Sequence, residues 1–199
     1  MRKSWMRTRR RRGNRSVLAW LTRQPKDSIN SKGIDRSSGF VSLADSPVKR
    51  DAEIVFVNIL LSLGAVLYCK TSVAQASFAA EPENHIIGYI ANAQNRFLSL
   101  GGSSGGEHHL IALRSSVVGF GRDIGGSIRH PAALNGLFGL KPSYQRLPFE
   151  HTSHVMEGQD FVPFSLGPLW SSAAGLTNVT KSVLGRDPWL TDPRVVEAP

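Results

Sequence analysis

Apolar residues recur at helical spacing in the stretch that follows Asp51. Ile54, Val57 and Leu61 are three or four residues apart, and Asp51 and Glu53 stand where a helix dipole favours negative charge. We therefore predict a helix that begins near Asp51 and ends at the first glycine that follows it.

The next stretch, AVLYCKT (65–71), is a short run dominated by apolar residues. Such a run predicts a strand buried on both faces, as in a parallel sheet covered by helices. Its single cysteine, Cys69, is then expected to be a small buried side chain. The succession of helix, glycine and apolar strand is typical of an α/β protein.

The rest of the pattern predicts short elements separated by glycine and proline. Residues 21–50 are expected to hold loops and short strands, and residues 1–20 an unstructured arm. The other predictions are a helix at 107–114, a strand at 117–120, a glycine-rich turn at 121–127, a short helix starting at 127, and a helix around 175–184.

The formal net charge of +9 is concentrated at one end of the chain. Residues 1–15 hold eight of the 24 basic residues and no acid, so 24 − 8 = 16 basic residues face 15 acidic ones elsewhere. A terminal block of like charge is typical of a solvated arm, so we expect no nucleic-acid partner. We expect a cytoplasmic location, with mitochondrial targeting by the arginine-rich start left open.

Several other classes are disfavoured by composition. A lone cysteine forms no internal disulfide. The most apolar window, 54–69, is shorter than the ~20 residues that a membrane-spanning helix needs. The histidine pairs His108–His109 and His151–His154 lack the spacing of a zinc site, so we predict surface or loop histidines and no metal.

Ten of the 19 glycines lie between residues 101 and 139, a stretch that includes two glycine-rich loops containing serine. In the second loop, Ser127 follows two glycines, so its hydroxyl can stand at an open turn. The backbone N–H groups of Ile124, Gly125, Gly126 and Ser127 can converge there as an oxyanion hole. Serine needs a base to become a nucleophile, and a lysine of lowered pKa can serve. A flexible linker is disfavoured because apolar sequence bounds each cluster, and neither loop has phosphate-loop spacing.

The stretch 101–142 resembles the signature region of the amidase signature family. It reads GGSSGGE, then a strand, then GRDIGGSIRHPA, then GLFGLKP. The flanks GFVSL (39–43), LGAVLYCKTSV (63–73) and MEGQDFVPFSLGPL (156–169) resemble the fungal acetamidase-like branch, and the resemblance spans roughly residues 24–195. It implies an α/β/α fold with a mixed sheet flanked by helices, and hydrolysis of a small-molecule amide to a carboxylate plus ammonia or an amine. It implies no cofactor.

The resemblance also implies roles for individual residues. Lys26, Ser103 and Ser127 match the lysine base, the bridging serine and the serine nucleophile, and the peptide bond before the bridging serine is cis in the family. Ser104, Asp123 and Arg129 match positions that support the two loops. Glu107 is better explained as a carboxylate at a helix start than as an acid catalyst.

The chain departs from the family at four positions. His108 and His109 stand where small residues are usual, Arg122 where threonine is usual, and Pro25 where an apolar strand residue is usual. Family enzymes have several hundred residues, so residues 21–199 are expected to be the N-terminal portion of such a domain. The alternative to an active amidase is therefore a catalytically inactive truncated fragment. A sheet edge left exposed in such a portion predicts self-association.

Overall fold

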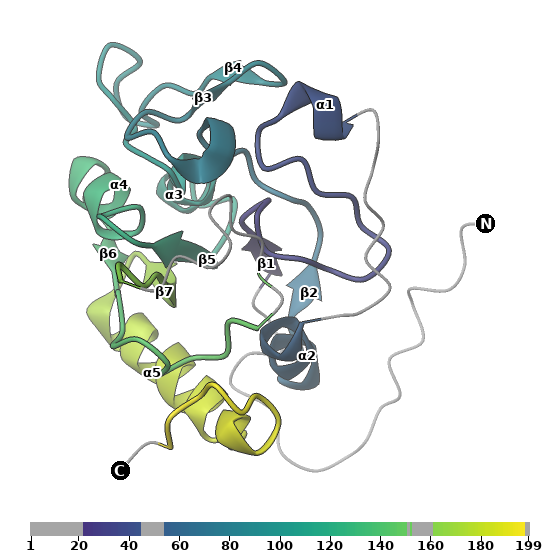
Figure 1. Cartoon of the computed structure of the whole chain (residues 1–199). Coiled ribbons are helices and arrows are strands. Elements are labelled where there is room, and N and C mark those ends of the chain that lie inside the picture. Colours follow the sequence, from purple (N-terminus) through teal and green to yellow (C-terminus); the bar gives the residue numbers. More distant parts are fainter. Residues whose placement is uncertain (1–21, 45–53, 151, 153–160, 198–199) are drawn as a thin grey trace.

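The computed structural model describes residues 22–44, 54–150, 152 and 161–197 (Figure 1). The expected N-terminal arm, the start of the helix predicted from Asp51, and His151 and His154 lie outside these residues.

A five-stranded mixed sheet forms the centre of the described part, in the order β2-β1-β5-β7-β6. The five strands are β1 (Thr22–Pro25), β2 (Val66–Leu67), β5 (Val118–Asp123), β6 (Phe138–Gly139) and β7 (Ser165–Trp170). Strand β1 runs parallel to both β2 and β5, whereas β7 is antiparallel to β5 and β6. The expected α/β architecture with a mixed sheet is therefore correct.

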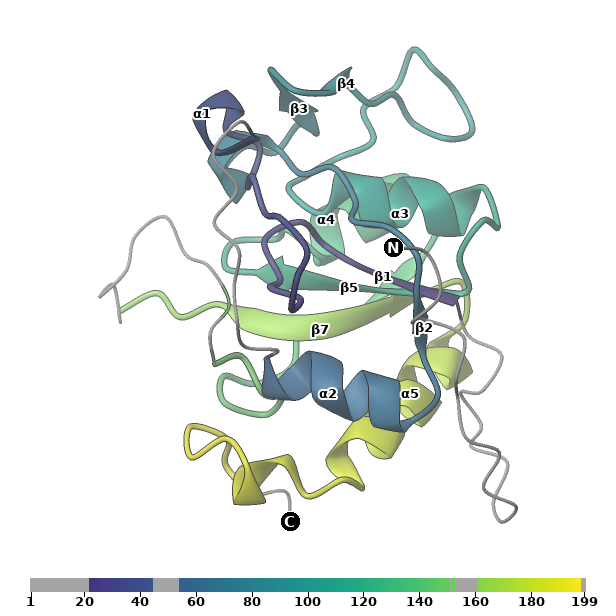
Figure 2. The same cartoon turned by 90° about the vertical axis from the view of Figure 1, so that its right-hand side faces the viewer.

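Helices cover both faces of this sheet. Figure 2 shows α3 (Gly105–Ala112) and α4 (Arg129–Leu134) on one face, and α2 (Val55–Ser62) and α5 (Ala173–Leu184) on the other. The short elements are α1 (Val41–Ala44), η1 (Gln75–Ser77), η2 (Pro188–Leu190) and the hairpin of β3 (Glu83–Asn84) with β4 (Gly88–Tyr89).

The larger apolar core lies between the sheet and the pair α2 and α5. Its centre includes Phe56 of α2 and Phe120 of β5, whose ring centroids are 4.8 Å apart in an edge-to-face arrangement. A smaller cluster of Ile111, Ile128 and Leu169 fills the opposite face under α3 and α4. Because helices cover both faces of the sheet, β5 is buried along its whole length.

The strand predicted at 65–71 is shorter and more exposed than expected. Only Val66 and Leu67 are in a strand, they form the edge of the described sheet, and Val66 is 56% exposed. Cys69 is exposed, so its predicted burial is wrong. The parallel pairing was expected correctly, but an apolar run does not say whether its strand has a neighbour on each side.

Two further strands differ from the prediction. Strand β5 continues through Gly121, Arg122 and Asp123, which were expected to form a turn. Gly121 is there because α3 lies close: a Cβ at that position would stand 2.6 Å from the Ser104 hydroxyl oxygen. Strand β7 was not predicted, because Gly167 and Pro168 interrupt its apolar pattern.

No helix within the described ranges is long and apolar enough to cross a membrane.

Candidate active site

The parallel pairing of β1 and β5 places two candidate segments at one edge of the sheet. Lys26 follows the last residue of β1, and the loop 124–127 follows the last residue of β5. Carboxyl ends of parallel strands meet at the same edge, where ligands commonly bind in α/β proteins. Pro25 ends β1 and is tolerated there, and the backbone N–H of Lys26 still reaches the carbonyl oxygen of Phe120, at 3.5 Å.

The first glycine-rich loop brings Ser103 to the same edge. This loop leads into α3, and the Gly102–Ser103 peptide bond is cis. Ser104, at the N-cap of α3, donates its backbone N–H to the carbonyl oxygen of Ser127 at 3.2 Å. This backbone hydrogen bond links the two serine loops.

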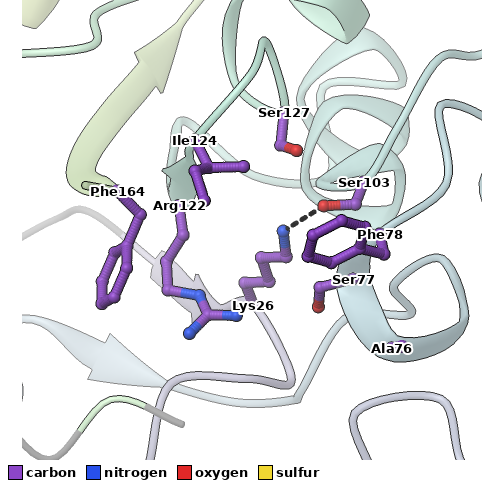
Figure 3. A pocket seen from close by; sticks show the side chains of 9 residues that line it. All are labelled: Lys26, Ala76, Ser77, Phe78, Ser103, Arg122, Ile124, Ser127 and Phe164. Atoms are coloured by element: carbon purple, nitrogen blue, oxygen red, sulfur yellow. Dashed lines mark hydrogen bonds between the residues drawn. The ribbon is translucent and has the colours of Figure 1, made fainter. Parts of the chain in front are cut away.

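Lys26 and Ser103 are in direct contact. The Lys26 Nζ donates to the Ser103 Oγ at 2.8 Å, and the two residues are each about 1% exposed (Figure 3). Ser127 is half-buried and lines the same pocket, together with Arg122, Ile124, Phe164 and the segment 76–78. The structure therefore brings together all three residues that sequence resemblance implied as a triad.

Burial is the main influence on the pKa of Lys26, and it lowers that pKa well below the ordinary value. The positive charge of Arg122 lowers the pKa further, whereas the carboxyl groups of Glu107 and Asp123 raise it. Since the lowering effects prevail, the Lys26 amine loses its proton more readily than an exposed lysine. A neutral amine at this place can accept a proton from the hydroxyl that it contacts.

Asp123 organises the second loop through one buried carboxylate. Its Oδ1 accepts from the Gly126 N–H at 2.8 Å, and its Oδ2 accepts from the N–H groups of Ile128 and Arg129 at 3.1 and 3.2 Å. The Arg129 guanidinium adds two bonds of 2.9 and 3.0 Å. Burial raises the pKa of Asp123, but these hydrogen bonds outweigh it and hold the pKa below the ordinary value.

The four backbone N–H groups expected to converge as an oxyanion hole are not equivalent. The N–H of Gly126 is occupied by Asp123, whereas those of Ile124, Gly125 and Ser127 have no acceptor among the residues that the structure describes. Gly126 has a φ of +131°, a conformation that L side chains rarely adopt, so glycine is required there.

Two side chains on α3 are buried beneath the site. Glu107 accepts from the Thr71 hydroxyl and, at 3.0 Å, from the N–H of Phe120, so its place at the helix start was expected correctly. His108 is fully buried with Nδ1 2.7 Å from the carbonyl oxygen of Ser104, so the prediction of a surface histidine is wrong here. His109 is half-buried, with Nδ1 3.1 Å from the carbonyl oxygen of Ala91.

The two buried groups titrate in opposite directions. Burial raises the pKa of Glu107 from 4.5 to about 8, and burial lowers the pKa of His108 from 6.5 to about 4. Between pH 4.5 and 8 the folded state retains the Glu107 proton that the unfolded state loses, so stability falls as pH rises. Between pH 4 and 6.5 the unfolded state binds a proton at His108 that the folded state does not, so stability rises with pH. The two effects oppose each other up to pH 6.5, and above it Glu107 acts alone.

We therefore predict that stability falls between pH 6.5 and 8 by up to about 1.4 kcal/mol per pH unit from Glu107. The Glu107→Gln chain should lose this slope, because glutamine does not titrate. Urea unfolding of both chains at pH 6.5 and 8 measures the difference, and other groups contribute equally to both. Parallel pH dependences of the two chains would contradict the raised pKa.

Arg122 is the residue of this site whose position sequence reasoning missed. It was noted as a departure beside the loop, but not as a buried residue lining the pocket. Strand β5 continues to Asp123 and so places Arg122 against the pocket. The prediction of a turn from residue 121 did not indicate this position. The described residues contain no cluster of three or more metal-ligating side chains.

Comparison with known proteins agrees with this arrangement. The model of the family described as Amidase matches residues 7–199, beginning well before residue 24, where sequence resemblance was placed to start. An acetamidase of Emericella nidulans is 44% identical over 174 residues, which cover 87% of this chain and 31% of that protein. A probable amidase of Saccharomyces cerevisiae is 37% identical over 172 residues, covering 86% and 31%.

Solved structures agree as well. A fatty acid amide hydrolase superposes with a TM-score of 0.85 at 33% identity, over 90% of this chain and 31% of that chain. A bacterial aryl acylamidase of the amidase signature enzymes superposes with a TM-score of 0.78 at 25% identity, over 92% and 37%. The chain spans about a third of the length of the curated relatives it matches. With the family model matching nearly all of its length, the chain belongs to the amidase family, in a branch similar to the fungal acetamidases.

Proposed function

We propose that this chain carries the catalytic residues of an amide hydrolase. The observation that supports this most is the 2.8 Å contact between the Lys26 amine and the Ser103 hydroxyl, buried in a pocket that Ser127 also lines. A buried lysine with lowered pKa beside a hydroxyl is an arrangement suited to removing a proton, whereas a structural lysine is ordinarily exposed or paired with a carboxylate.

In the proposed reaction, Ser127 attacks the amide carbon. A bond forms between the Ser127 Oγ and this carbon, and the proton of Ser127 passes through Ser103 to the neutral Lys26 amine. The same proton then reaches the leaving nitrogen as the carbon–nitrogen bond breaks, releasing ammonia or an amine. Water then attacks the acyl carbon while one of its protons passes through Ser103 to Lys26. That proton returns to the Ser127 Oγ as the bond between this oxygen and the acyl carbon breaks, releasing the carboxylic acid.

The negative charge that develops on the amide oxygen needs donors. We propose that the N–H groups of Ile124, Gly125 and Ser127 supply them, because these groups have no other acceptor among the described residues. The N–H of Gly126 instead holds the loop to Asp123. Loss of one such donor costs about 10²–10³ in rate in comparable sites.

The relative described as an acetamidase suggests small linear amides as substrates. The competing proposal is a catalytically inactive amidase-like chain, because His108 and Arg122 stand where the resembled family usually has a small residue and threonine.

The experiment is covalent trapping with a fluorophosphonate probe at pH 8, followed by peptide mapping, alongside measurement of ammonia released from acetamide. We expect one adduct, located on Ser127, and ammonia above the blank. The Ser127→Ala chain is the blank for both readouts, and the buried Ser116→Ala chain is the matched serine control. Folded chain that forms no adduct would favour the inactive alternative, and an adduct on another serine would refute the assigned nucleophile.

A further inference from the structure

Arg122 is a buried cation without a counterion among the described residues. It is 8% exposed, and its Nε and Nη1 have no hydrogen-bond partner within the described ranges. Its guanidinium carbon lies 5.1 Å from the centre of the Phe164 ring, a cation–π contact. The neighbouring carboxylate of Asp123 is committed to Arg129 and to three backbone N–H groups.

A guanidinium in this situation keeps its charge. Burial and the positive charge of Arg36 lower the pKa of Arg122 only to about 10, so it is protonated at neutral pH. Glu107 does not neutralise it, because burial raises the pKa of that carboxyl to about 8. Burying a charge with unsatisfied donors is costly, and such a group binds an anion strongly when one is supplied.

Arg122 lines the pocket that Ser103 and Ser127 also line. Figure 3 shows Arg122 beside Lys26, with Ser103 and Ser127 lining the same pocket. Ser77 lines it too, and its hydroxyl oxygen is buried without a hydrogen-bond partner among the described residues. Two side chains in this pocket thus have unused capacity to donate hydrogen bonds.

We propose that Arg122, assisted by Ser77, is a carboxylate-binding subsite, so that the preferred substrates are amides that also carry a carboxylate group. A planar guanidinium matches the two oxygens of a carboxylate, which a lysine or threonine does not. Arg122 stands where the resembled family usually has threonine, so this subsite is a property of the present chain. The inference rests on the proposed function for its substrate, and on the Arg122 geometry for its anion.

Two other roles for Arg122 make different predictions. If it only stabilises β5 and its neighbours, its replacement weakens folding but not the choice between ligands. If it only lowers the pKa of Lys26, its replacement shifts the pH profile of Ser127 labelling and leaves binding of charged and neutral ligands in the same ratio. A carboxylate subsite alone predicts a loss confined to the charged ligand.

The test is calorimetric binding to the Ser127→Ala chain, which requires no catalysis. Succinamate is compared with its neutral isostere succinamide, placing the carboxylate on the acyl side of the amide. N-acetylglycine is compared with N-acetylglycinamide, placing it on the amine side. We expect one charged ligand to bind on the order of 10- to 100-fold more tightly than its neutral isostere, and the pair that shows this identifies the side.

Replacement of Arg122 then decides the assignment. In the Ser127→Ala background, Arg122→Thr should abolish the preference for the charged ligand without changing the affinity for the neutral one, and Arg122→Lys should retain part of the preference. Ser77→Ala should reduce it by a smaller factor. Equal affinities of charged and neutral ligands in both pairs would overturn the proposal, as would a preference that survives Arg122→Thr.

The binding test and the labelling of Ser127 can succeed or fail independently. Without adduct formation on Ser127, the proposed hydrolysis fails while a preference that depends on Arg122 still establishes the anion subsite. With an adduct and no preference, the hydrolysis stands and the subsite fails. Should Arg122→Thr not fold, as judged by circular dichroism, the ligand pairs and Arg122→Lys still decide the question.

Discussion

Replacing Lys26 by methionine is expected to slow covalent labelling of Ser127 by on the order of 10³-fold at pH 8. Methionine fills a similar volume in the buried site, so the change removes the amine at 2.8 Å from Ser103 with little loss of packing. The rate constant of fluorophosphonate labelling measures the effect. Lys70→Met is the matched control, because the Lys70 Nζ donates to the carbonyl oxygen of Ile29 and Lys70 is not among the residues that line the pocket of the two serines.

The same prediction has a pH signature. The base is active only when neutral, so labelling should rise with pH through the pKa of Lys26 and then level off. Burial and Arg122 lower that pKa, so the plateau should be reached well below the ordinary lysine value of about 10.4. The Lys26→Met chain should show no such rise. Labelling of equal rate in wild type and Lys26→Met would refute the assignment of the base.

Ser103 should behave as part of the same unit. If the proton passes from Ser127 through Ser103 to Lys26, Ser103→Ala loses a comparable factor, and the double replacement with Lys26→Met loses no more than either alone. Independent contributions would instead multiply. A double-mutant cycle therefore separates a relay from two unrelated supports.

The longer helices were predicted more closely than the strands, and α5 shows why, because it combines apolar spacing with an end signal. The helix predicted at 175–184 is observed as α5 from Ala173 to Leu184, with Ser172 accepting the Gly175 N–H as an N-cap. The helix predicted at 107–114 is observed as α3, which begins and ends two residues earlier than predicted. Local signals of this kind need no knowledge of the rest of the chain.

The strands were predicted less well, because tertiary contacts decide what their glycines mean. Gly121 was interpreted as part of a turn, yet it lies within β5 so that the Ser104 side chain can approach. Gly167 broke the apolar pattern of β7, yet a Cβ there would stand 2.0 Å from the carbonyl oxygen of Leu140. In both strands the glycine allows another part of the chain to pack closely. The spacing of apolar residues and the strand propensity of glycine do not predict such a contact.

Candidate site residues came from resemblance rather than from spacing. Lys26 and Ser103 are 77 residues apart, and no local pattern relates them until β1 and α3 are placed on the sheet. Burial of His108 and Arg122 could not be predicted either, since polar residues are ordinarily exposed. These two positions differ from the family pattern, so resemblance gave no information about their surroundings.

Asp123→Asn is expected to destabilise the fold by about 3–5 kcal/mol and to remove most labelling of Ser127. The carboxylate is fully buried and accepts five hydrogen bonds, three from backbone N–H groups of residues 126, 128 and 129. An asparagine offers one acceptor oxygen and turns an NH₂ group toward donors, so buried N–H groups lose their partners. The free energy of unfolding in urea at pH 7 measures the loss, since the pKa of Asp123 lies below its ordinary value and its stabilisation disappears only in acid.

The matched comparison is Arg129→Met, which removes the partner of the same ion pair and leaves the backbone bonds intact. The Arg129 side chain is 54% exposed, so this change should cost no more than about 1 kcal/mol and should leave labelling nearly unchanged. If the two replacements cost the same, the ion pair would be the main contribution and the backbone bonds a minor one. If Asp123→Asn costs much more free energy of unfolding than Arg129→Met, the Asp123 carboxylate itself holds the loop 124–127 in shape. In that shape the Gly126 N–H is bonded to Asp123, and the N–H groups of the adjacent residues are available to a substrate. The same buried acceptor would then account for both the folding of this edge of the sheet and the donors that the proposed chemistry requires.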